Sequence, residues 1–114
     1  MRHGVRGILF LLVGIGCAAP AMAQLAADLE EGDALIDEER PDAAIGRLEG
    51  LLDQTGGTDA AEVYWRLASA TLMRGDQRDD AGAGEDELLA IYAQGEAYGQ
   101  DVIDADPSNA LGYY

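Results

Sequence analysis

The chain has 114 residues, of which seven are arginine, none is lysine and twenty-two are aspartate or glutamate, so its net charge at pH 7 is −15. A surface of this sign repels phosphate groups, which excludes nucleic acid and anionic lipid as expected partners. The single histidine and the single cysteine both lie within residues 1–17, so the rest of the chain lacks the commonest general base and metal ligand and cannot form a disulfide. These absences argue against most enzyme classes, and we expect no cofactor.

Residues 1–23 have the features of a secretory signal peptide. Two arginines precede an apolar run over residues 8–15, which is too short to cross a bilayer core of about 30 Å as a helix. The small side chains of Ala21 and Ala23 fit a signal peptidase that cuts directly after Ala23. We therefore expect export to the periplasm or secretion, with a retained membrane anchor as the alternative.

The working protein is then residues 24–114, which form one small domain with five arginines against twenty-two acidic residues, a net charge of −17. Cys17 allows a second interpretation, because bacterial lipoproteins are cut just before a cysteine that then carries the lipid. Lipoprotein processing favours a larger aliphatic residue three places earlier, where this chain has Gly14. Lipidation of Cys17 is therefore the less favoured alternative.

Apolar residues recur at helical spacing through most of residues 24–114. The first helix is expected at 25–36. The second is expected at 41–53, because proline is tolerated in a first turn and an aspartate follows it at the positive end of the helix dipole. An approximate capping box of Asp59 and Glu62 predicts the start of the third helix.

The third helix is expected to stop at Gly75, because residues 76–84 have neither a helical period nor bulky side chains and are typical of a solvated loop. The fourth helix is expected to begin near Glu85 and to end at Asp106, since the residue before a proline disfavours helix. No alternating β pattern competes with these helices. The predicted fold is therefore all-α: two antiparallel helix hairpins and the start of a third, stacked as a right-handed α-solenoid.

The hairpins resemble tetratricopeptide repeats (TPR), whose helix pairs pack through small residues and end in a proline. The positions that carry this resemblance in the second pair are Tyr64, Leu67, Ala68, Thr71, Gly75, Gly95, Val102 and Pro107. Those in the first pair are Gly32, Leu35, Ala44, Leu48 and Leu51. Asp28 and Glu31 stand where bulky apolar residues are usual, so the first repeat is degenerate. Close approach of the helices explains the small residues at Gly32, Ala44, Ala68 and Gly95, because a larger side chain there would force the pair apart.

The second pair also exceeds the usual repeat length of about 34 residues, because a long insertion follows Gly75. Residues 61–68, this insertion, a helix closing with residues 106–110, and Tyr113-Tyr114 together resemble the regulator of microtubule dynamics family and its bacterial repeat-protein relatives. The resemblance implies a helical scaffold that binds other proteins. The microtubule role of the animal members does not carry over to an exported bacterial-type protein.

Residues 110–114 match only the first few positions of a third repeat. A solenoid needs about three repeats and a polar cap to cover its last apolar face. We therefore expect the chain to be a fragment of a longer repeat protein. The alternative is a small complete protein that covers this face by forming a homodimer.

The densest group of carboxylates lies at residues 76–87, beside glycines, and could gather oxygen ligands around calcium. It lacks the spacing of an EF-hand loop, so we expect a solvated acidic loop and keep calcium as the alternative. The glutamate pairs at 30–31 and 38–39 lie between apolar positions of the first helix and are typical of its solvated face. We expect no catalytic residues and no metal site.

In a superhelix, the first helix of each pair lines the concave face. The residues of these helices that lie outside the packing stripe form the candidate partner-binding groove: Asp33, Ile36, Trp65, Ser69, Leu72 and Met73. Trp65 either anchors a partner or packs in the core. The expected function is a non-catalytic scaffold for protein–protein interaction in the cell envelope, with a partner whose charge is basic. The alternative is a transporter-associated component that binds a solute in an apolar pocket with converging polar groups.

Overall fold

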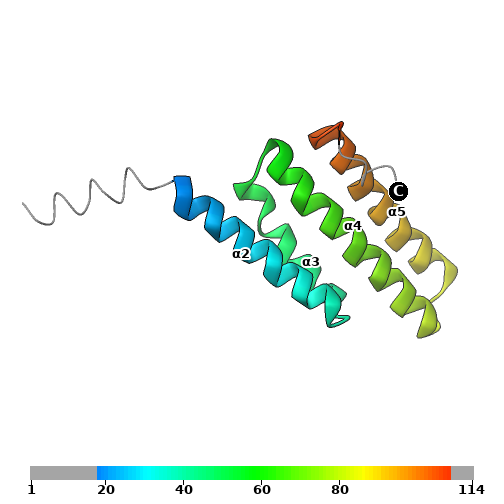
Figure 1. Ribbon diagram of the computed structural model, residues 1–114. Coiled ribbons are helices and arrows are strands. Elements are labelled where there is room, and N and C mark those ends of the chain that lie inside the picture. The colour runs from blue at the N-terminus through cyan, green and yellow to red at the C-terminus, as the bar shows by residue number, and fades with distance from the viewer. Residues whose placement is uncertain (1–17, 109–114) are drawn as a thin grey trace, which may run out of the picture.

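The computed structural model describes residues 18–108, and these residues contain no β-strand. The elements in chain order are α2 (Ala18–Asp37), α3 (Pro41–Glu49), the short 3-10 helix η1 (Leu52–Gln54), α4 (Gly57–Asp80) and α5 (Glu85–Ala105). The all-α prediction is confirmed: α2 with α3, and α4 with α5, form two helical hairpins (Figure 1). The apolar run at 8–15, Cys17 and the predicted third repeat at 110–114 lie outside the described residues.

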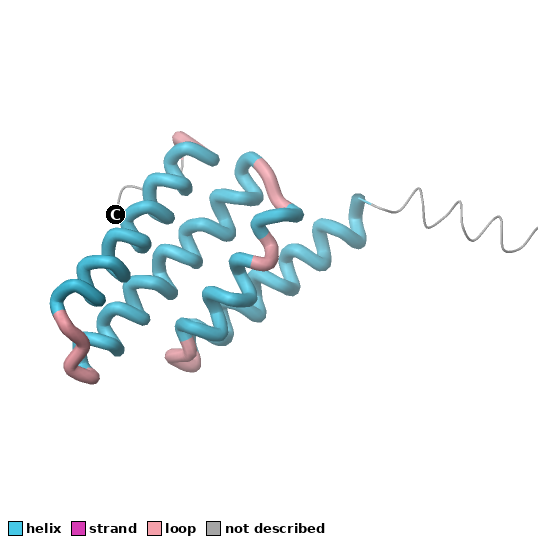
Figure 2. The backbone as a smooth tube through the Cα atoms, turned by 180° about the vertical axis from the view of Figure 1, so that it is seen from behind, coloured by secondary structure: helices cyan, strands magenta, loops and turns pink. Residues whose placement is uncertain are grey.

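Helix α4 is the central element, because it packs along α5 on one side and against α3 and α2 on the other. Figure 2 shows the four helices from behind, with loops joining them at alternating ends. The core lies where α3 and α4 meet, and its buried residues are Ala44, Ile45, Leu48, Leu51, Val63, Leu67 and Ala70. Ile45, Leu48 and Leu51 recur at helical spacing within the second predicted helix, 41–53, so periodicity identified the buried face of that helix correctly.

Two glycines predicted to allow close helix approach do so. A Cβ atom added at Gly32 of α2 would lie 2.8 Å from Cδ2 of Leu48, which is fully buried. A Cβ atom added at Gly95 of α5 would lie 3.1 Å from Cδ2 of Leu72. A larger residue at Gly32 would push against buried Leu48, whereas at Gly95 it would require a shift of a few tenths of an ångström by the exposed side chain of Leu72.

The predicted end of the third helix at Gly75 is wrong, and so is the predicted loop at 76–84. Helix α4 continues to Asp80, and only residues 81–84 separate it from α5. Gly75 is buried against α5, because an added Cβ atom would lie 2.6 Å from Cε1 of Tyr92, whose hydroxyl donates to Asp76 at 2.9 Å. The glycine serves packing rather than helix termination, and the insertion lengthens the second hairpin.

The true end of α4 is a Schellman motif. The N–H of Ala83 donates to the carbonyl of Arg78, and the N–H of Gly82 donates to that of Asp79, both at 2.9 Å. Gly82 has φ of +88°, the left-handed conformation that this motif requires. Helix α2 ends with the same pattern of hydrogen bonds, although Glu39, with φ of 57°, occupies the left-handed position.

Three other predicted boundaries are also wrong. Helix α2 begins at Ala18 rather than at residue 25. Helix α3 ends at Glu49, and the N–H of Leu51 donates to the carbonyl of Leu48 before the chain tightens into η1. Helix α4 begins at Gly57, and its N-cap residue, Gly56, has no side chain that could cap it. The carboxylate of Glu62, expected in a capping box, instead accepts hydrogen bonds from Trp65 and Arg66. The predicted start at Glu85 is correct.

Tyr98 of α5 ties the two hairpins together and makes stability sensitive to high pH. Its hydroxyl donates to Oε1 of Glu49 at 3.1 Å, and its ring lies 6.3 Å from that of Tyr64. Burial, followed by the charge of Glu49, raises the pKa of Tyr98 from 10.0 to about 12. Since folding favours the protonated phenol, this stabilisation is complete below pH 10 and is lost as the pH rises through about 12.

We therefore expect the Tm to fall across this pH interval, and to fall less in Tyr98→Phe, which has no phenol proton to lose. The measurement is the Tm of both proteins at a series of pH values, followed by circular dichroism. The other tyrosines titrate in both proteins, so parallel curves would contradict a role for Tyr98.

Candidate partner-binding face

The six predicted groove residues lie on two neighbouring helices, with Asp33 and Ile36 on α2 and the other four on α4. The four on α4 follow helical spacing along one side and are named here the α4 face: Trp65, Ser69, Leu72 and Met73. Ser69 and Leu72 are exposed, whereas the other two side chains are half-buried. The α4 face is therefore a mixed polar and apolar strip that solvent reaches.

The structure gives three of the predicted residues additional contacts. Ile36 is half-buried and packs against the core. Leu72 lies beside Gly95 of α5, although 44% of its surface is exposed. Asp33 forms an ion pair with Arg66. Outside the core and this ion pair, the surface open to a partner consists of Ser69, Met73 and the exposed parts of Trp65 and Leu72.

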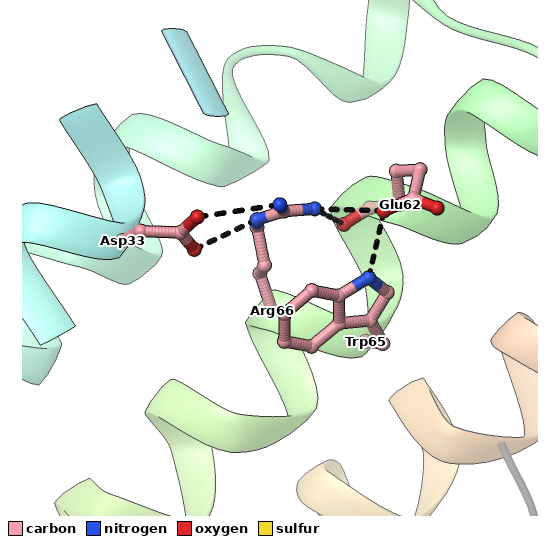
Figure 3. A network of polar contacts seen from close by, with 4 residues as sticks. All are labelled: Asp33, Glu62, Trp65 and Arg66. Carbon is pink, nitrogen blue, oxygen red and sulfur yellow. Dashed lines mark hydrogen bonds and ion pairs between the residues drawn. The ribbon is translucent and has the colours of Figure 1, made fainter. Parts of the chain in front are cut away.

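A polar network centred on Arg66 joins α2 to α4 (Figure 3). The guanidinium donates from Nε to Oδ1 of Asp33 at 2.8 Å and from Nη2 to Oδ2 at 3.3 Å, so the pair is bidentate. Its Nη1 donates to the carboxylate of Glu62 at 3.0 Å and to the Glu62 carbonyl at 2.9 Å. This role of Arg66 was not predicted from the sequence. The available signal was the spacing of four between Glu62 and Arg66, which brings an acid and a base together on a helix.

Trp65 is held in place by the same network. Its indole N–H donates to Oε2 of Glu62 at 2.9 Å, and the guanidinium carbon of Arg66 lies 4.3 Å from its ring centroid. This distance is that of a cation–π contact. One face of the indole is thus occupied by a cation of the chain itself, and the ring presents its remaining surface in a defined orientation.

Most arginines of the described residues form ion pairs with acidic residues of the same chain. These pairs are Arg47 with Asp28 and Glu31, Arg66 with Asp33 and Glu62, Arg74 with Asp42, and Arg78 with Asp42 and Glu87. They engage six acidic residues. All twenty-two acidic residues lie within 18–108, so sixteen of them have no arginine partner in this part of the chain. The surface therefore carries a large uncompensated negative charge.

A hollow of about 230 Å³ lies between the first half of α2 and the connection from α3 to α4. Leu25 and Leu51 contribute apolar lining, and Asp28 contributes a carboxylate. Ala21 and Met22 also line it, and both precede the predicted cleavage point. The hollow in this form therefore depends on residues that processing would remove.

Within residues 18–108, no group of three or more acidic, histidine or cysteine side chains is placed to hold a metal ion. Asp76, Asp79 and Asp80, which we expected in an acidic loop, instead lie in the last turns of α4. The same described helices include none that combines the length and the apolar character needed to cross a membrane.

Comparison with protein-family models, with curated proteins and with solved structures gives no match. The resemblance to tetratricopeptide repeats thus rests on the sequence positions given above and stays a prediction. The interpretation of the α4 face depends on its own contacts, exposure and charge.

Proposed function

We propose that this chain is an exported, non-catalytic, TPR-like scaffold that binds a basic segment of another protein in the cell envelope. The observation that carries the proposal is the charge balance: sixteen acidic residues lack an arginine partner within the described part of the chain. A partner rich in lysine or arginine would be attracted by this field and oriented by it.

The α4 face supplies the short-range chemistry for such a partner. Met73 is flexible and polarizable, so it adapts to varied side chains. The exposed part of Leu72 offers apolar contact, and the indole of Trp65 is preorganised by Glu62 and Arg66. Asp76 follows on the same side of α4 and adds negative charge. These features favour an amphipathic segment in which basic and apolar residues alternate.

The hollow beside α2 gives less support to the alternative of a solute-binding, transporter-associated component. Its volume of about 230 Å³ is below the range of about 300–1,000 Å³ that small-molecule sites usually have. Two of its lining residues, Ala21 and Met22, would leave with the signal peptide. We therefore favour a scaffold that binds a protein partner at an open face over a component that encloses a solute.

The test measures binding of a fluorescent peptide of alternating lysine and leucine to the exported protein by anisotropy, at low and at physiological salt. We expect binding that weakens with salt, and we expect Ser69→Arg to weaken it by about tenfold because the new cation lies on the α4 face. The matched control is Ala93→Arg, which adds the same charge at an exposed position of α5. Equal losses in the two variants, or no binding by the unaltered protein, would overturn the proposal.

A further inference from the structure

We infer that Gln24 is converted to pyroglutamate in the exported protein, which makes the start of α2 a modification site. The inference rests on the export part of the proposed function, specifically on cleavage directly after Ala23. It does not depend on binding at the α4 face.

Helix α2 tolerates that cleavage without loss of the core. Residues 21–24 are all exposed, and Leu25, which follows them, packs against the core. A cut after Ala23 removes residues 18–23 of α2 and leaves 24–37, with the close contact at Gly32, in place. The processed helix therefore begins at Gln24, on the surface.

The new terminus brings an ammonium group to the positive end of the helix dipole, where a positive charge is unfavourable. Glutamine can remove this charge by itself. The α-amino nitrogen attacks the side-chain carbon Cδ and forms a C–N bond. The bond from Cδ to Nε2 breaks, and Nε2 leaves as ammonia with a proton from the attacking amine. The product is a neutral five-membered lactam, and the reaction needs no oxidant or co-reactant.

The local structure restrains this reaction without preventing it. Nε2 of Gln24 donates to Oδ1 of Asp28 at 3.0 Å, one helical turn further along α2. This hydrogen bond directs the amide along the helix, away from the α-nitrogen that must attack it. Because the Gln24 side chain is exposed, no packing opposes its release.

The first experiment expresses the full 114-residue chain with its own leader in a bacterium and measures the intact mass of the exported product, at once and after incubation. We expect a chain that begins at Gln24 and becomes lighter by one ammonia. Gln24→Ala, cut at the same bond, should keep its full mass. A product that begins at Gln24 and retains the ammonia overturns the inference and leaves export standing. A product that begins elsewhere overturns both the inference and the predicted cleavage site.

A second comparison tests the role of the hydrogen bond. Asp28→Ala frees the Gln24 amide and should raise the rate of ammonia loss several-fold. The control is Glu31→Ala, which also removes an ion pair with Arg47 but leaves the bond between Gln24 and Asp28 intact. An equal or slower rate in Asp28→Ala would overturn the restraint assigned to Asp28.

Discussion

Leu48→Ala is expected to lower the free energy of unfolding by about 3 kcal/mol, within the range of about 2–5 kcal/mol typical of buried leucines. Leu48 has no exposed surface and lies in the core between the hairpins. Truncation removes buried apolar atoms and leaves a cavity that the backbones of α2 and α3 cannot fully close. Urea denaturation at equilibrium measures the loss. The matched control is Leu89→Ala on α5, where the residue is 60% exposed and the expected change is within about 0.5 kcal/mol.

Because Leu48 lies against Gly32, we expect the effect of Gly32→Ala to depend on whether Leu48 is present. Gly32→Ala places a Cβ atom 2.8 Å from Cδ2 and 3.2 Å from Cγ of Leu48. Overpacking of this kind costs about 1–3 kcal/mol, offset by up to about 1 kcal/mol from the better helix propensity of alanine. In Leu48→Ala those two atoms are absent, so Gly32→Ala should be neutral or stabilising there. Additive effects in a double-mutant cycle would contradict the close approach of α2 and α3.

Arg66→Met is expected to lower the free energy of unfolding by about 2 kcal/mol, because charge-assisted hydrogen bonds at a nearly buried group are worth more than exposed ones. Only 13% of the Arg66 side chain is exposed, and it bonds to acids on two helices. The control is Arg47→Met, because Arg47 also pairs with two acids but is 43% exposed. Its removal should cost less than about 1 kcal/mol. Equal losses would contradict the central role of Arg66.

Trp65 provides a second readout of the same network, because it is the single tryptophan of the chain. Its indole lies against the Arg66 guanidinium at 4.3 Å. Arg66→Met should therefore change the tryptophan emission of the folded protein, whereas Arg47→Met should leave it unchanged. Unaltered emission in both variants would contradict the role of Arg66 in holding the indole, and with it the preorganisation of Trp65 on the α4 face.

Apolar periodicity allowed much of the fold to be predicted. Leu48 and Leu67 each belong to a set of apolar residues that lies on one side of its helix, and an amphipathic helix buries that side. Helix ends were harder to predict because a glycine has more than one use. Gly75 was interpreted as a terminator, whereas it admits the ring of Tyr92, and the true end of α4 uses Gly82. Which glycine ends a helix depends on what packs against it.

Helical periodicity also allowed part of the α4 face to be predicted. Positions 65, 69, 72 and 73 share one side of α4 by helical spacing alone, so their grouping followed from local geometry. The partners of these residues could not be predicted locally. Asp33 reaches Arg66 across 33 positions of sequence, and this pair exists only because α2 lies beside α4.

By itself, therefore, the sequence determined the all-α class, the negative charge and two of the glycines at which helices meet, Gly32 and Gly95, because composition and a period of 3.6 residues depend only on neighbours along the chain. The tertiary structure alone decided that α4 extends to Asp80, that Glu39 adopts a left-handed conformation, and that Arg66 pairs with Asp33. Each of these outcomes requires contacts or chain reversals whose energy outweighs the local preference, and such contacts form only when the hairpins pack together.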